Sequence, residues 1–341
     1  GALVMTKNSK DTDMNELISA MVGRSLDNRF PKVDNTPGEV VFKVEHLSTK
    51  YAPKLQDITF DVKKGEIFGL YGLVGAGRTE LLETIFGIRT RAAGRVYYNN
   101  KLMNFRSSRD AMNHGFALIT EERKADGLFL KSDITFNTTI ANMKQYRSGV
   151  ALSKDDMVRA TAEEIRIMHT KCMGPDDMIA NLSGGNQQKA VLSKWLMTKP
   201  RVLIMDEPTA VLTPQEIDTL MEFVRRYVEQ GNSVVFITHK MREVMAVSDT
   251  IVVMRNGSIC GTVKKTDTSE AELAHMMIGR ELETLEKPGT EDMSNRRVRL
   301  AVKDLSIKPK DHTPLLEDIN FEIHEGEVLG FAGVSDNGQQ E

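Results

Sequence analysis

The sequence predicts an α/β fold, and three features point to it. An apolar stretch, Ile67–Tyr71, runs into a glycine-rich loop that opens a helix. Two further apolar runs, Val202–Met205 and Val234–Thr238, have the composition of buried strands and end in polar residues. A helix-rich pattern occupies residues 134–180. Buried strands alternating with helices are typical of a central, mostly parallel sheet.

Composition limits the classes of protein to consider. The 341 residues are 40% hydrophobic and 27% charged, which indicates a globular chain of about two domains. A net charge of -3 offers no electrostatic footprint for nucleic acid. The chain has no run of eighteen apolar residues, so any membrane role is expected to be peripheral. Two cysteines without ligand-like spacing, and a start that lacks the pattern of a signal peptide, favour a reducing cytosolic setting.

Two segments near the start of the chain recur near its end. Leu55–Gly69 matches Leu316–Gly330, and Glu16–Arg24 matches Glu272–Arg280, at offsets of 261 and 256 residues. A repeat of about that length is a whole domain and not a solenoid unit.

The repeat predicts three parts. Residues 1–36 are the tail of a preceding copy and a linker, and 37–284 form a complete copy. Residues 285–341 are a linker and the start of a following copy, which carries its own glycine loop at 333–340.

The complete copy begins with β structure. Alternating apolar and polar residues within Glu39–Val62 predict two or three antiparallel strands. The buried strand Ile67–Tyr71 follows, and after the glycine loop we expect a helix through about Phe86. The loop itself consists of Gly72, Leu73, Val74, Gly75, Ala76, Gly77, Arg78 and Thr79.

This loop has phosphate-binding spacing, which is Gly-x-x-x-x-Gly followed by a basic residue and a hydroxyl. Its backbone N–H groups are expected to hold phosphates, and Thr79 to reach Mg²⁺. Arg78 stands where such loops carry lysine. Guanidinium is larger and planar, so the exchange is not conservative. We expect nucleotide binding to be retained and the rate of hydrolysis to be affected.

Two later motifs carry further chemistry. In Leu182–Lys189, a serine and two glycines open a helix and present bare N–H groups to an anion. The strand 202–206 delivers Asp206 and Glu207 at its tip. One carboxylate can bind Mg²⁺ while the other orients or deprotonates a water, as nucleotide hydrolysis requires. His239 follows the strand 234–238, at the kind of strand end where ligands gather in open α/β sheets.

With these motifs the chain resembles the ATP-binding-cassette (ABC) ATPases. The resemblance implies a P-loop fold with an antiparallel β subdomain, a central mostly parallel sheet and a helical subdomain, which binds ATP and Mg²⁺. It implies that Asp206 binds Mg²⁺, that Glu207 is the catalytic glutamate and that His239 is the switch histidine. The implied signature residues, which contact the ATP of a facing cassette, are Ser183, Gly184, Gly185 and Gln187.

The resemblance also assigns two less distinctive positions. Tyr51 lies upstream of the loop, where the family has an aromatic residue that stacks on adenine. It could equally be a packed edge residue. Glu121 occupies the place of a glutamine that links Mg²⁺ to the transport partner.

Different segments of the chain resemble different branches of the family. The stretches 72–81, 121–128 and 182–189 are similar to the second cassette of tandem sugar importers of the ribose, galactose and xylose group. After Thr209, the segment Ala210–Glu216 is similar to the first cassette of nucleoside importers. Recombination, a truncated tandem and a fusion all remain open.

The expected function is therefore that of an ATP-hydrolysing subunit that powers a monosaccharide importer. Its expected partners are a second cassette, an integral membrane permease and, indirectly, a substrate-binding protein, but not nucleic acid. We expect it in the cytoplasm, at the inner face of the cell membrane. A nucleoside-importer ATPase and a non-hydrolytic nucleotide-binding module remain as alternatives.

Overall fold

The computed structural model describes residues 35–279, 296–307 and 316–331. The chain divides into two compact units, one of residues 30–282 and the other of residues 1–29 with 283–341. Each is treated by itself below. The predicted repeat tail at 16–24 and the predicted second glycine loop at 333–340 lie outside the described residues.

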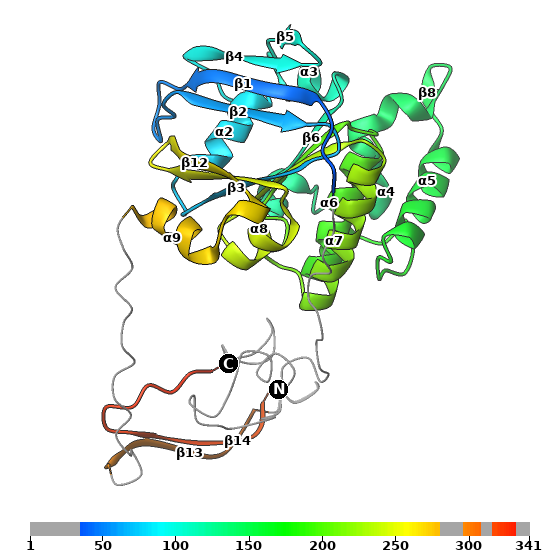
Figure 1. Ribbon diagram of the computed structural model, residues 1–341. Helices are drawn as coiled ribbons and strands as arrows, with labels where there is room; N and C mark the ends of the chain where they lie inside the picture. The colour runs from blue at the N-terminus through cyan, green and yellow to red at the C-terminus, as the bar shows by residue number, and fades with distance from the viewer. Residues whose placement is uncertain (1–34, 280–295, 308–315, 332–341) are drawn as a thin grey trace. The chain divides into compact units, whose positions relative to one another are not determined.

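An antiparallel sheet forms one layer of the larger unit (Figure 1). Its strands, in the order β2-β1-β4-β5, are β1 (Val40–Ser48), β2 (Ile58–Lys63), β4 (Ala93–Tyr98) and β5 (Lys101–Met103). Apolar side chains alternate along β2 and are buried, with polar ones exposed between them. The antiparallel pairing of β1 with β2 confirms the prediction made for residues 39–62.

The second sheet holds the functional strand ends. Its order is β12-β11-β3-β10-β9-β6. Its members are β3 (Ile67–Gly72), β6 (Phe116–Ile119), β9 (Val202–Asp206), β10 (Ser233–Thr238), β11 (Thr250–Arg255) and β12 (Ser258–Lys264). All pairings are parallel except that of β12 with β11. Because β3, β10 and β9 are adjacent and parallel, their carboxyl ends, and the loops that follow, meet at one edge.

Helices cover both faces of this sheet (Figure 1). They are α2 (Arg78–Ile85), α3 (Ser108–Asn113), α4 (Ile134–Thr139), α5 (Lys154–Ile167), α6 (Gly184–Leu196), α7 (Pro214–Glu229), α8 (Met241–Val247) and α9 (Glu270–Ile278). Shorter helical turns are a π-helical turn at Arg123–Gly127 and 3-10 turns at Ile140–Tyr146, Ile179–Asn181 and Lys265–Asp267.

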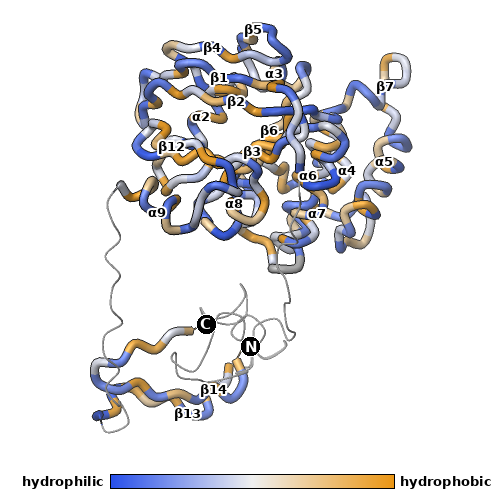
Figure 2. The backbone as a smooth tube through the Cα atoms, in the orientation of Figure 1, coloured by the Kyte–Doolittle hydropathy of each residue, from blue (hydrophilic) through white to orange (hydrophobic). Residues whose placement is uncertain are grey.

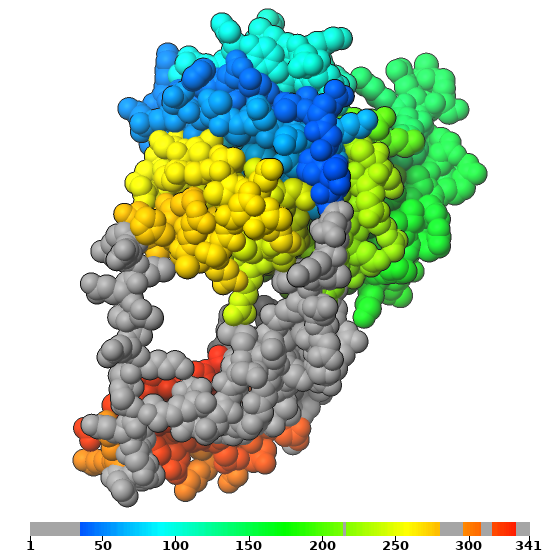
Figure 3. Space-filling view, viewed as in Figure 1, coloured from blue at the N-terminus to red at the C-terminus, as the bar shows by residue number. Residues whose placement is uncertain are grey.

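The helical subdomain predicted for residues 134–180 contains α4 and α5, and also a small hairpin of β7 (Arg147–Ser148) and β8 (Ala151–Leu152). It forms a lobe at one side of the domain, coloured green in Figure 3.

Two apolar clusters hold the layers together. In the first, Phe42 and Ile58 of the antiparallel sheet pack with Leu81 and Leu82 of α2 and with Phe68 of β3, so α2 lies between the sheets. In the second, the opposite face of the parallel sheet packs on α6 and α7. Figure 2 shows the apolar strands inside and polar residues outside. Burial of both sheet faces explains why β3, β9 and β10 are continuous apolar runs.

The smaller unit contains a hairpin of β13 (Val298–Ile307) and β14 (Leu316–His324). Its register reproduces that of β1 and β2: Val302 pairs with Phe321 as Val44 pairs with Phe60, with register shifts at the equivalent places. Asp304 takes the positive φ of its counterpart, His46. The repeated sequence therefore forms the same hairpin twice.

The segment after this hairpin differs from its counterpart. Residues 327–331 form no strand, and Val328 and Phe331 are 96% and 66% exposed. In the larger unit, the equivalent Ile67 and Leu70 are buried in β3, which pairs with β10 and β11. A central strand needs such partners for its hydrogen bonds and apolar side chains.

Candidate functional site

The glycine loop links the buried end of β3 to the start of α2. Gly77, at the helix N-cap, has φ 93°, and a Cβ there would lie 2.8 Å from Leu55 Cδ2. Glycine is required here because other residues adopt this backbone conformation only with strain. The loop tip is open, with Leu73 and Val74 51% and 83% exposed. The loop thus offers accessible backbone N–H groups beside a helix N-terminus, which suits an anion.

Thr79 and Asp206 lie together behind this loop. The Thr79 hydroxyl donates a hydrogen bond of 2.8 Å to Asp206 Oδ2. Asp206 is only 3% exposed, and this burial raises the pKa of its carboxyl group to about 6, with Glu121 and Glu207 adding smaller contributions. A cation bound beside this buried carboxylate would stabilise its charged form.

Arg78 and Glu207 form a buried ion pair across the same edge. Arg78 Nη1 lies 3.0 Å from Glu207 Oε1, with the two side chains 8% and 1% exposed. Glu207 follows β9 with φ 44°, a left-handed conformation that is uncommon for a residue with a side chain. Its backbone N–H donates to Ile237 O of β10, which fixes it at the end of the neighbouring strand.

His239 contacts the same carboxylate oxygen. Its backbone N–H and its ring Nδ1 each lie 2.8 Å from Glu207 Oε1. The imidazole is 44% exposed, so its other edge is accessible. Glu207 Oε2, in contrast, is buried and has no hydrogen-bond partner among the described residues. The histidine therefore connects a buried carboxylate with the surface of the site.

A polar network that sequence reasoning missed supports the loops after β9 and β10. Glu243, 5% exposed on α8, accepts hydrogen bonds from Thr209 and Thr238 at 2.6 and 3.1 Å. Lys240 Nζ lies 3.1 Å from Glu243 Oε1 and also donates to the Thr209 hydroxyl. The only sequence signal was one acidic residue in the short helix after His239, which is weak evidence. The network ties the two loops that carry Glu207 and His239.

The signature residues open α6. Ser183 is the N-cap and is exposed, while Gly185 and Gln187 are buried. Gln187 donates to Ile179 O at 3.2 Å and accepts from Arg123 Nε at 3.3 Å. Among the described residues, no hydrogen bond or ion pair is seen between the signature and the glycine loop. The structure thus groups Arg78, Thr79, Asp206, Glu207 and His239, but leaves the signature outside this group.

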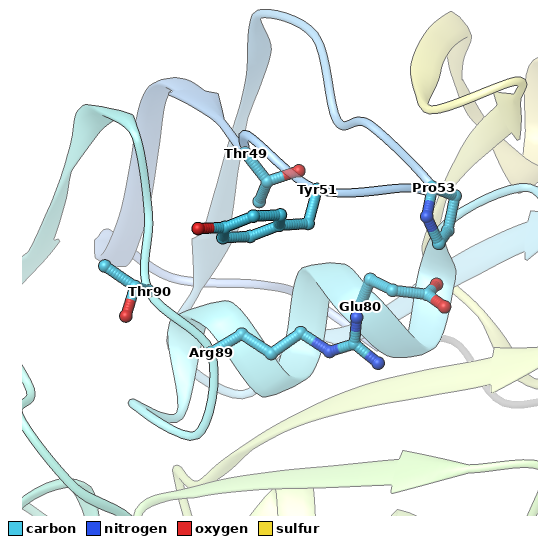
Figure 4. A pocket seen from close by; sticks show the side chains of 6 residues that line it. All are labelled: Thr49, Tyr51, Pro53, Glu80, Arg89 and Thr90. Carbon is cyan, nitrogen blue, oxygen red and sulfur yellow. The ribbon is translucent and has the colours of Figure 1, made fainter.

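Tyr51 borders a separate hollow of about 200 Å³ (Figure 4). Its side chain is 77% exposed, so it is not a packed core residue. The other lining residues are Thr49, Pro53, Glu80, Arg89 and Thr90. Glu80 belongs to α2, which places this hollow on the helix that the glycine loop opens.

Glu121 is exposed in the loop after β6. Its negative charge contributes to the raised pKa of Asp206, so the two carboxyl groups are close enough to interact. Within the described ranges, no group of three or more His, Cys, Asp or Glu side chains is arranged to hold a metal ion. Thr79 and Asp206 nevertheless supply adjacent hard oxygen ligands. That pair fits Mg²⁺, which commonly binds through one or two protein carboxylates together with phosphates and water.

Known proteins with a similar sequence share one family. A family model described as "ABC transporter" matches residues 55–210. The galactose/methyl galactoside import ATP-binding protein MglA of Treponema denticola is 47% identical over 276 residues, 81% of this chain and 56% of that protein. Its Salmonella typhimurium namesake is 37% identical over 277 residues, 81% of this chain and 55% of that protein. The chain thus spans about half the length of the curated relatives it matches.

Solved structures show the same fold. An ATP-binding cassette of an ABC transporter, MJ1267 in its ADP conformation, has a TM-score of 0.58 at 20% identity and covers 70% of this chain and 94% of its own. The cassette MJ0796, solved as a post-hydrolysis dimer bound to ADP and Pi, has a TM-score of 0.59 at 19% identity, with 66% and 98% covered. No helix in the described ranges is long and apolar enough to cross a membrane. Residues 55–210 of this chain therefore match a domain of the ABC transporter family.

Proposed function

We propose that this chain binds and hydrolyses ATP as the nucleotide-binding subunit of an ABC importer of galactose- or ribose-type monosaccharides. The observation that carries the proposal is the cluster of Arg78, Thr79, Asp206, Glu207 and His239 at the carboxyl ends of β3, β9 and β10. Ligands bind at this edge of open α/β sheets.

In this proposal the loop Gly72–Thr79 binds the phosphates through its backbone N–H groups and Arg78. Tyr51 stacks on the nucleobase, because its ring is exposed beside the hollow on α2 (Figure 4). Thr79 and Asp206 would hold Mg²⁺, with Glu121 at its periphery. When bound, that ion supplies charge neutralisation for the phosphates.

Hydrolysis is assigned to Glu207 and His239. Glu207 orients or deprotonates the attacking water, and the accessible edge of the His239 ring contacts the γ-phosphate. The strained backbone of Glu207 and the network around Glu243 hold both groups in place.

A second cassette is needed in this scheme. The N-terminus of α6, where Ser183 is exposed, is proposed to contact the γ-phosphate of an ATP held by the facing cassette, together with Gly184, Gly185 and Gln187. Membrane attachment and sugar import would come through a permease at the cytoplasmic face, with a substrate-binding protein acting outside. The names of the relatives support the sugar assignment.

One observation favours a second candidate, a nucleotide-binding module without hydrolysis. The carboxylate proposed as the base is already paired with Arg78, which stands where lysine is usual. If bound nucleotide left this pair intact, Glu207 would be a poor base.

ATP hydrolysis by Glu207→Gln separates the two candidates. We expect the full chain to bind ATP and hydrolyse it, and the variant to keep binding while losing activity by roughly two orders of magnitude or more. Glu163→Gln, an exposed glutamate on α5, is the matched control and should hydrolyse normally. Binding without hydrolysis in the unaltered chain would favour the module instead.

The cargo needs a separate measurement. In cells that lack their own galactose-import ATPase but retain its permease, the chain should restore uptake of labelled galactose. Restored nucleoside uptake in the corresponding nucleoside-importer strain, without galactose uptake, would move the assignment to the nucleoside branch.

A further inference from the structure

The Arg78–Glu207 ion pair joins two residues to which the proposed mechanism gives separate roles. Arg78 is the cation of the loop expected to bind phosphates, and Glu207 is the proposed base. They are 129 residues apart in sequence but 3.0 Å apart in the structure, and both side chains are almost fully buried. Removing one member of a buried ion pair strongly destabilises the charge that remains, so each holds the other in place.

The hydrogen bonds of Glu207 are distributed unevenly between its two oxygens. Oε1 contacts the Arg78 guanidinium, the His239 backbone N–H and the His239 ring. Oε2 is sealed from solvent and has no partner among the described residues. A general base must reach the proton that it accepts. In this arrangement one oxygen is occupied by donors and the other is out of reach of water.

Phosphates would compete directly for the guanidinium. Guanidinium presents five N–H donors in a fork that matches phosphate oxygens, and charge-assisted bonds of this kind are about twice as strong as neutral ones. Arg78 is the first residue of α2 and belongs to the glycine loop itself. A nucleotide whose phosphates lie in that loop therefore reaches Arg78 before it reaches Glu207.

We propose that Arg78 holds Glu207 in a resting state, and that the phosphates of an incoming nucleotide release it. This inference rests on the proposed function, because it requires that the glycine loop bind a nucleotide. Arg78 is thereby a positioning residue for Glu207: the carboxylate becomes free to contact water only when phosphate is present. Lysine at this position would be a single charged point on a flexible stem and would lack the planar set of donors that guanidinium offers to phosphate.

The pair is tested first without nucleotide. Melting temperatures of the full chain are measured for Arg78→Met, Glu207→Gln and the double variant. Each single variant leaves one buried group without its partner, so the double variant should melt roughly 4 °C or more above the value that additivity predicts. In saturating ADP with Mg²⁺ this difference should disappear, because the guanidinium then contacts phosphate.

Affinity for ADP gives a second readout. With Arg78 present, Glu207→Gln should bind ADP about tenfold more tightly, equivalent to about 1.4 kcal/mol, since the guanidinium no longer has to leave a carboxylate. Glu122→Gln removes an exposed charge from the loop after β6, at a residue with no proposed contact to nucleotide or Mg²⁺, and serves as the matched control. With Arg78→Met, both glutamine variants should change the affinity equally. If Arg78→Met does not fold, comparing the ADP affinities of the two glutamine variants, with Arg78 present, still tests the inference.

Each result has a distinct meaning. Additive melting temperatures, or equal ADP affinities for Glu207→Gln and Glu122→Gln, would overturn the inference while leaving nucleotide binding intact. If the melting temperatures remain non-additive in saturating ADP, the ion pair is a static structural element, and the proposed release of Glu207 by phosphate is overturned. Failure of the unaltered chain to bind ADP at all would overturn the proposed function, and release with it.

Discussion

Lys194 offers a quantitative test of how this domain accommodates a buried charge. It lies on α6, is 6% exposed, and donates a hydrogen bond of 2.5 Å to Gly127 O. The ring of Trp195 is 5.2 Å away. Burial lowers the pKa of its ammonium group from 10.5 to about 8. Lys194→Met keeps a long side chain of similar shape and removes the charge.

The pKa shift determines the size and sign of the effect. Lowering the pKa from 10.5 to about 8 corresponds to about 3 kcal/mol of unfavourable free energy for the charged form in the folded chain. Removing the hydrogen bond to Gly127 costs about 1 kcal/mol. At pH 7 the Met variant should therefore be more stable by about 2 kcal/mol.

The difference should change with pH. Between pH 8 and 10.5 the folded chain releases the Lys194 proton while the unfolded chain retains it, so the stability of the unaltered protein rises with pH relative to the variant. The advantage of the variant should shrink by about 1.4 kcal/mol per pH unit and reverse by about pH 10.

Urea unfolding of both proteins at pH 7, 8, 9 and 10 measures this difference directly. Trp195 is the only tryptophan and reports the transition by fluorescence, with circular dichroism as the check because the substitution lies beside it. The other titrating groups are the same in both proteins, so their contributions cancel in the difference between the two unfolding free energies. A stability difference that stays constant over this pH range, or a less stable variant at pH 7, would refute the reasoning.

Two substitutions test the nucleotide loop and its surroundings. Tyr51→Ala should weaken ADP binding roughly tenfold, because base stacking on an aromatic ring contributes about 1–3 kcal/mol. Tyr51→Phe retains the ring and should keep the affinity. Equal ADP titration curves for the unaltered chain and both variants would exclude the stacking role. Gly77→Ala should lower the free energy of unfolding by about 1–3 kcal/mol, because its φ of 93° and the 2.8 Å contact to Leu55 Cδ2 exclude a Cβ. Gly174→Ala, where a Cβ would meet nothing within 4 Å, is the control, and equal urea midpoints for the two alanine variants would contradict this account.

The parts of the fold that are readable from sequence are those with a local cause. Continuous apolar runs predict β3, β9 and β10, because a strand covered on both faces has no polar positions. The loop spacing predicts where α2 begins, since glycine is needed at Gly77. The internal repeat predicts that the segment of β14 resembles that of β2, and the two strands do form hairpins of similar register. The mixed sugar and nucleoside ancestry stays a prediction.

Other features depend on which strands become neighbours. The pairing of Arg78 with Glu207 requires β3 and β9 to lie on either side of β10, and residues 129 positions apart carry no local signal of that order. The Glu243 network and the contact of Lys194 with Gly127 have the same origin. Sequence alone therefore predicts a phosphate-binding loop and places two carboxylates at a strand end. Their state in the folded chain, with Glu207 bound by Arg78 and His239 and closed to water, is decided by the strand order and by the burial that it imposes.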